Sequence, residues 1–110
     1  MKTLLILRHA KSSHGNESFS DHDRPLNQRG QRDAPRIGEL LSAENLLPDL
    51  IVSSTARRAH DTTELLLSAS AYRGPVMYLP ELYLAGPADC LRLLGEIKGL
   101  FIVLLLLFID

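Results

Sequence analysis

Short apolar runs alternate with amphipathic stretches along most of this chain of 110 residues. The apolar runs predict four strands, at residues 4–7, 50–52, 76–78 and 100–105. The first run has no alternation of apolar and polar positions, which favours a strand that is covered on both faces over a half-exposed hairpin strand. The pattern therefore indicates parallel packing with helices on the sheet.

Between the first two runs, apolar residues recur at helical spacing and predict a helix over residues 28–44 that stops at Asn45. Pro35 lies inside this pattern and has no amide hydrogen to donate within a helix. The helix is therefore expected either to begin near Ala34 or to be kinked at Pro35.

A second helix is predicted over residues 56–68, with Ser54 or Thr55 as the side chain that caps it. This places Arg57 and Arg58 in the first turn, where cations are unfavourable beside the positive end of the helix dipole. We expect Arg57 to point outward into solvent. For Arg58, a bound anion would explain the position better.

The third helix is predicted to begin with Pro87 at its first position and to end at Gly99. Strands and helices then alternate along the whole chain. This order is typical of an α/β fold in three layers, with a mainly parallel, doubly wound sheet. The length favours a single domain over residues 1–110.

Composition and charge narrow the function classes. Apolar residues make up 45% of the chain, and the net charge of −1 gives no argument for nucleic acid or a membrane surface as partner. Cys90 is the only cysteine, which excludes an internal disulfide and favours the cytoplasm. The apolar run before Arg8 is too short for a signal peptide, and the run at 100–109 is well short of the ~20 residues of a membrane span.

The candidate chemistry follows the first strand, where Arg8, His9, Lys11 and Ser12 come directly after the apolar run. Ligands in open α/β sheets bind outside the carboxyl ends of the strands. If the first and second strands are neighbours in the sheet, Arg8, His9 and Arg58 converge on one crevice. Cations beside an imidazole suit a phosphate, which Lys11 and Ser12 are also expected to bind.

His9 has three possible roles. As a nucleophile it must be neutral, and nearby guanidiniums favour the neutral ring while they hold phosphoryl oxygens. Such a site needs no metal or other cofactor. As a metal ligand, His9 would join other side chains of the following loop, but the neighbouring cations oppose a divalent ion; these side chains are His14, His22, Asp21 and Asp23. The third interpretation is that His9 has no chemical role, because an Arg-His pair after a strand is common by chance.

Two other phosphate chemistries are excluded by spacing. The chain has no glycine-rich loop that ends in Gly-Lys-Ser/Thr, which excludes a P-loop enzyme. A cysteine-based phosphatase would need an arginine six residues after Cys90, and that position is Glu96.

Three blocks, at residues 5–12, 23–30 and 53–62, together resemble the histidine phosphatase superfamily with its phosphoglycerate mutase-like fold. Within it, they are most similar to the SixA-type phosphohistidine phosphatases. The first block contains the Arg-His signature, with Ala10 where many branches have glycine. The third resembles Ser-x-x-x-Arg-Ala-x-x-Thr and carries the second phosphate-binding arginine onto Arg58.

The resemblance implies that His9 is phosphorylated transiently and then hydrolysed, with Arg8 and Arg58 as phosphate clamps. The implied substrate is a phosphohistidine on a protein, or a small phosphorylated molecule. Glu81 falls near the position where some branches place a proton donor. A solvated loop carboxylate is the alternative interpretation of Glu81.

The resemblance departs at the end of the chain. Family members place a second catalytic histidine, typically in Gly-His-Asn, after the fourth strand, whereas residues 100–110 contain none. His60 is the last histidine, and we expect it beside the site at best. The chain is therefore predicted to be truncated or altered from about residue 100, with its fold incomplete after the fourth strand. The alternative function is that of an impaired fragment that only binds phosphate or a phosphoprotein.

Overall fold

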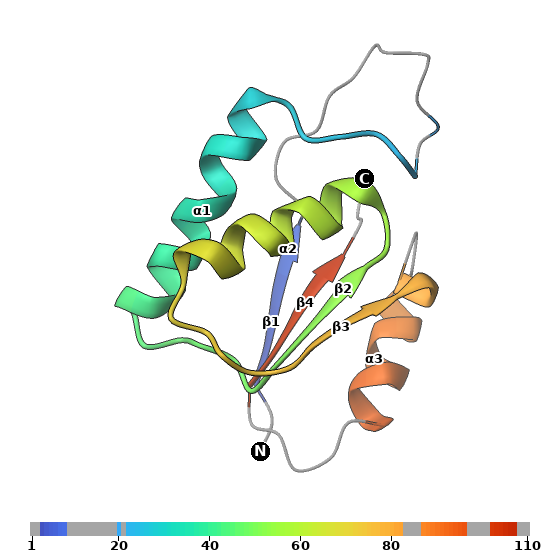
Figure 1. Ribbon diagram of the computed structural model, residues 1–110. Helices are drawn as coiled ribbons and strands as arrows, with labels where there is room; N and C mark the ends of the chain where they lie inside the picture. Colours follow the sequence, from blue (N-terminus) through green and yellow to red (C-terminus); the bar gives the residue numbers. More distant parts are fainter. Residues whose placement is uncertain (1–2, 9–19, 21, 83–86, 97–101, 108–110) are drawn as a thin grey trace.

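The computed structural model describes residues 3–8, 20, 22–82, 87–96 and 102–107. These residues form an α/β structure in which helices cover both faces of one sheet (Figure 1). The elements follow the predicted alternation, with a short 3-10 helix added, and in chain order they are β1 (Thr3–Arg8), α1 (Gln28–Ala43), β2 (Leu50–Ser54), α2 (Arg57–Ala69), β3 (Val76–Leu79), η1 (Pro80–Leu82), α3 (Pro87–Glu96) and β4 (Ile102–Leu107).

The sheet has four strands in the order β1-β4-β2-β3, and every neighbouring pair is parallel. The prediction that the first two strands are neighbours is wrong, because β4 lies between them. A uniformly apolar segment such as β4 suits an interior position in a sheet covered on both faces. The carboxyl ends of β1 and β2 still share one edge, but two strand spacings separate them, about 10 Å.

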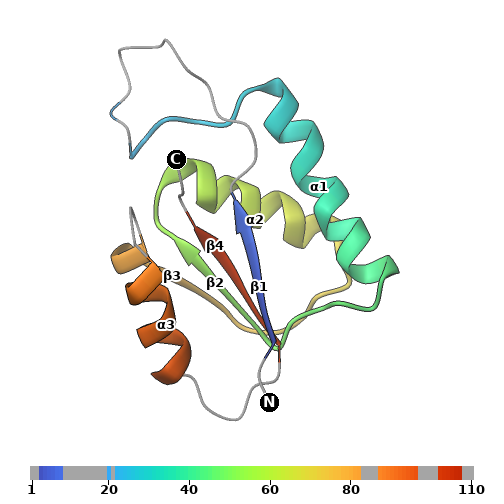
Figure 2. The same ribbon diagram turned by 180° about the vertical axis from the view of Figure 1, so that it is seen from behind.

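Helices α1 and α2 lie side by side on one face of the sheet, and α3 lies on the other (Figure 2). Helices α1 and α2 approach closely at Gly38 of α1, where a Cβ would lie 2.3 Å from the carbonyl oxygen of Leu66 in α2. Below this contact, the buried cluster that joins the helices to the sheet consists of Leu41, Ile51, Leu66 and Tyr72. The core therefore depends on glycine at that crossing.

The first helix begins at Gln28, so the alternative start near Ala34 is wrong. Asn27 determines this start, because its side-chain oxygen accepts a hydrogen bond from the amide of Gly30 at 2.9 Å. The helix continues through Pro35. Its predicted stop is confirmed, since Asn45 has a φ of 56°, the left-handed conformation common just after a helix.

The second helix begins at Arg57, one residue from the predicted start, but the predicted cap is wrong. Ala56 is the N-cap residue and makes no side-chain cap. The hydroxyl of Ser54 accepts a hydrogen bond at 3.1 Å from the amide of Ala56. This amide lies before the first turn of the helix. The hydroxyl of Thr55 lies 3.2 Å from a ring nitrogen of His22 instead.

The later elements agree with the sequence pattern where they are described. Pro87 is the first residue of α3, as predicted, and the helix is described to Glu96, whereas Gly99 lies outside the described residues. The fourth strand spans Ile102–Leu107, slightly later than the predicted 100–105. Among the described helices, none is long and apolar enough to cross a membrane.

Candidate functional site

Arg8 is the last residue of β1 and therefore lies at the carboxyl edge of the sheet, where it was expected. Its backbone is paired with Leu107 of β4. The side chain of Arg8 lies outside what the structure describes, and so do the residues His9, Lys11 and Ser12. Their roles stay predictions, and the described part of the site is built around the start of α2.

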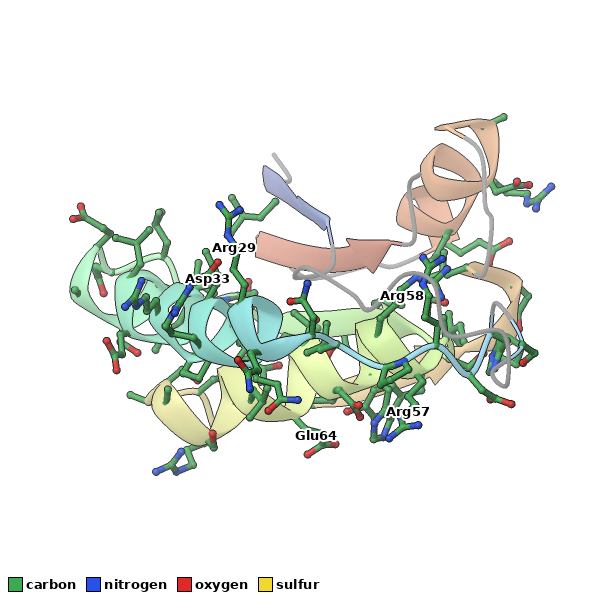
Figure 3. All side chains as sticks on the ribbon, turned by 90° about the horizontal axis from the view of Figure 1, so that it is seen from above. Arg29, Asp33, Arg57, Arg58 and Glu64 are labelled. Atoms are coloured by element: carbon green, nitrogen blue, oxygen red, sulfur yellow. The ribbon has the colours of Figure 1, made fainter. Side chains whose placement is uncertain are left out.

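Arg58 follows β2 and lies in the first turn of α2. It has no exposed surface and is the largest completely buried side chain among the described residues. Figure 3 places Arg58 on the side of α2 that faces the sheet, near the end of β4. Transfer of a guanidinium out of water is unfavourable by several kcal/mol, so its position indicates compensating electrostatic interactions at this edge.

Arg57 has the opposite environment, as the sequence predicted. Its side chain is exposed and points away from the sheet (Figure 3). It lies 3.6 Å from a carboxylate oxygen of Asp61, one helical turn further along. It also lines a cavity of about 290 Å³ on the outer side of α2, together with Glu64 and other residues. The side chains of these two consecutive arginines therefore lie on opposite sides of α2.

The segment before α1 contacts the start of α2, which sequence reasoning missed. The carbonyl oxygen of His22 accepts a hydrogen bond from the amide of Arg57 at 2.8 Å. The ring of His22 reaches Thr55 through Nε2 and Asp23 through Nδ1, the latter at 3.3 Å. The hydrogen bond from His22 holds the pKa of the Asp23 carboxyl below its usual range, with a smaller contribution from Ser20. Because the amide of Arg57 already donates to the carbonyl of His22, it is not available to a bound anion in this arrangement.

Arg24 is a second arginine with buried guanidinium atoms, which sequence reasoning did not single out, although the residue as a whole is half-buried. Its Nε and Nη2 atoms are buried, as is Nε of Arg58, and these three atoms have no hydrogen-bond acceptor in the part of the chain that is described. Both residues make other interactions. The available signal was the dense charge of the Asp-His-Asp-Arg-Pro run at residues 21–25.

Glu81 lies in η1, directly after β3, and is exposed. It lines a cavity of about 210 Å³ with Asp89, Arg92 and Glu96 of α3. Because Leu79 of β3 pairs with Ser54 of β2, η1 starts at the same edge of the sheet as α2. The position is compatible with a proton donor and with a solvated carboxylate, so the role of Glu81 stays a prediction.

His60 lies on the exposed side of α2. Its ring packs on Tyr78, with 4.7 Å between the ring centroids, and Nε2 lies 3.8 Å from a carboxylate oxygen of Glu64. Burial raises the pKa of the Tyr78 hydroxyl, which also donates a hydrogen bond to Glu64. His60 therefore belongs to a surface cluster on the opposite side of α2 from Arg58.

The described residues contain no group of three or more histidine, cysteine, aspartate or glutamate side chains that could hold a metal ion. His22 and Asp23 are close together, but the other side chains weighed as metal ligands, His9, His14 and Asp21, lie outside the described residues.

Comparisons with known proteins agree on one family. A family model described as the histidine phosphatase superfamily (branch 1) matches residues 4–83. An uncharacterised chloroplastic protein of Arabidopsis thaliana is 36% identical over 90 residues, which are 80% of this chain and 41% of that protein. A 2,3-bisphosphoglycerate-dependent phosphoglycerate mutase of Bifidobacterium longum is 39% identical over 69 residues, which are 61% of this chain and 28% of the mutase. The chain thus spans well under half the length of these curated relatives.

Among solved structures, a protein of Agrobacterium tumefaciens assigned as the phosphohistidine phosphatase SixA has a TM-score of 0.90 at 32% identity. The match covers 98% of this chain and 70% of that chain. The histidine phosphatase SixA complexed with tungstate has a TM-score of 0.80 at 22% identity, over 97% of this chain and 69% of that chain, and shows the likeness of fold alone.

Proposed function

Because the chain belongs to the histidine phosphatase superfamily, we propose that it is a phosphohistidine phosphatase that works through a transient phosphohistidine at His9. The substrate class that we favour is a phosphohistidine on another protein, with a small phosphorylated molecule as the alternative. The likeness to the Agrobacterium protein assigned as SixA supports this choice.

The observation that carries the proposal is the complete burial of Arg58 at the start of α2. A guanidinium keeps its charge at any working pH and offers a planar fork that matches phosphoryl oxygens. Arg58 follows β2 at the sheet edge where Arg8 ends β1. A phosphoryl group between these strand ends would meet cations from both sides.

The proposed reaction has two steps. A neutral ring nitrogen of His9 attacks phosphorus, and the bond from phosphorus to the substrate imidazole breaks as that imidazole takes up a proton, for which Glu81 is the candidate donor. Water then attacks the phosphorus and loses a proton, for which the deprotonated Glu81 is the candidate acceptor, while the bond to His9 breaks and phosphate leaves. Arg8 and Arg58 stabilise the charge on the equatorial oxygens in both steps.

The test is hydrolysis of a phosphohistidine-bearing protein, followed by ³¹P NMR. We expect turnover by the wild-type chain and none by His9→Ala. Arg58→Lys keeps the charge but loses the fork, so kcat/KM should fall about 10- to 100-fold. The matched variant Arg57→Lys should change it less than about twofold, because exposed ion pairs contribute little. Equal losses in the two variants would contradict the role of Arg58.

Binding without turnover is the second candidate function, because a buried guanidinium such as that of Arg58 can hold a phosphate without cleaving a bond to it. Calorimetric titration with inorganic phosphate separates the two. Phosphate binding that weakens in Arg58→Lys, with no hydrolysis by the wild-type chain, would support a phosphate-binding or phosphoprotein-binding role. A wild-type chain that neither binds phosphate nor hydrolyses the substrate would overturn both candidates.

A further inference from the structure

A chain of side-chain hydrogen bonds leads from the surface to the start of α2. The hydroxyl of Ser20 donates to one carboxylate oxygen of Asp23 at 3.1 Å, and the other oxygen lies 3.3 Å from Nδ1 of His22. Nε2 of His22 lies 3.2 Å from the hydroxyl of Thr55, two residues before α2 begins. Nε2 of His22 therefore joins two segments that are distant in sequence, while Nδ1 is held by the neighbouring Asp23.

The backbone makes the same connection independently. The His22 carbonyl accepts from the amide of Arg57, the first residue of α2. An amide in the first turn of a helix has no partner within the helix, and a side-chain cap usually supplies one. Because Ala56 cannot cap, the distant carbonyl takes over this role. The start of α2 is thus held by the segment before α1.

This connection joins the two segments that carry buried guanidinium atoms. Arg24 follows His22 by two residues, and Arg58 follows Arg57 directly. Nε of each arginine is buried. In Figure 3 the segment before α1 runs across the start of α2, on which Arg58 is labelled. Any shift of His22 relative to Thr55 would change the separation of the two arginines.

We propose that His22 is a positioning residue of the phosphate site, which fixes the loop carrying Arg24 against the helix start carrying Arg58. The inference rests on the proposed function, since it assumes that Arg58 binds phosphate. Asp23 orients the ring: a carboxylate only accepts hydrogen bonds, so Nδ1 carries a proton and, in the neutral ring, Nε2 accepts from the hydroxyl of Thr55.

The first measurement is the affinity for inorganic phosphate. His22→Ala and Thr55→Val should each weaken binding about fivefold, the effect of one lost hydrogen bond. Thr55→Ser keeps the hydroxyl and should restore most of the affinity. The double variant His22→Ala/Thr55→Val should be no weaker than His22→Ala alone, because both changes remove the same contact.

A control separates positioning from general destabilisation. Asn27→Ala removes the cap of α1 and lowers stability without touching the contact between His22 and Thr55. If Asn27→Ala weakens phosphate binding as much as His22→Ala does, the inference is overturned. It is also overturned if the wild-type chain binds phosphate and His22→Ala binds it equally well. A wild-type chain that neither binds phosphate nor hydrolyses the phosphohistidine-bearing protein instead overturns the proposed function.

Nitrogen NMR of the His22 ring gives a second readout that does not depend on phosphate. We expect the Nδ1-protonated tautomer in the neutral ring of the wild-type chain, and its loss in Asp23→Ala. His22→Ala keeps the backbone carbonyl but removes the side-chain contact to Thr55 that holds this segment in place, so the amide of Arg57 should exchange with solvent faster than in Asn27→Ala. A neutral ring protonated at Nε2, or unchanged exchange of that amide, would contradict the proposed arrangement.

Discussion

Helices α1 and α2 lie side by side on one face of the sheet, but they begin in different ways. The start of α1 is satisfied locally: Asn27 accepts from the amide of Gly30 through its side chain and from Gln31 through its carbonyl oxygen. The start of α2 has no cap from its own N-cap residue and depends on the carbonyl of His22, which belongs to a distant segment.

The difference separates a helix start that is held locally from one that is held by a distant segment. A local cap holds a helix without constraining any other segment. The contact between His22 and the start of α2 instead couples two parts of the chain, and each of these parts carries an arginine with buried nitrogen atoms. The coupled start lies at the carboxyl edge of the sheet, where the candidate phosphate site lies.

The largest expected effect comes from separating the two helices. In Gly38→Ala, the new Cβ would lie 2.3 Å from the backbone oxygen of Leu66, so the helices must move apart. We expect a loss of about 3 kcal/mol in the free energy of unfolding, measured by urea denaturation. Phosphate affinity should fall as well, because α2 carries Arg58.

Gly95 in α3 provides the matched control, because a Cβ there meets nothing within 4 Å. Gly95→Ala should stabilise the chain by up to about 1 kcal/mol through the higher helix propensity of alanine. If both glycine variants behave alike, the close crossing of α1 and α2 does not hold the helix pair together.

Much of the fold could be predicted because the signals for it are local. The apolar runs identified the strands, and Asn45 and Pro87 correctly marked a helix end and a helix start. Pro35 alone leaves two possible starts for α1, whereas the side-chain cap at Asn27 favours the earlier one. Both features are local, and the cap determines where the helix begins.

The errors concern contacts between distant segments. Thr55 suits a cap by residue type, but its hydroxyl contacts His22 in the fold. The position of β4 between β1 and β2 depends on tertiary packing, which local periodicity does not report. The absence of Arg58 from the solvated face could be predicted because its helix position is unfavourable for a cation, whereas its phosphate role stays a prediction. Arg24 lies in a loop that offers no such signal.

A smaller effect is expected from the local cap. Asn27→Ala leaves the amide of Gly30 without its side-chain acceptor, which should lower the free energy of unfolding by about 1 kcal/mol. Phosphate affinity of the folded chain should stay within about twofold of wild type, because a local cap constrains no other segment. A larger change in affinity would show that the two helix starts are coupled after all.

The smallest effect is expected from low pH, and it tests the start of α2 alone. The pKa of the Asp23 carboxyl lies below its ordinary value of 3.8, so the folded chain binds fewer protons there than the unfolded chain. The resulting stability is fully present above pH 3.8 and is lost as the pH falls through the lowered pKa. The stability difference between the wild-type chain and Asp23→Asn should therefore shrink from pH 6 toward pH 2.5.

Since His22 lowers this pKa more than Ser20 does, an NMR titration should show a larger rise of the pKa in His22→Ala than in Ser20→Ala. The reverse order would mean that the contact between His22 and Asp23 is weak in solution and that the start of α2 is held by the backbone alone.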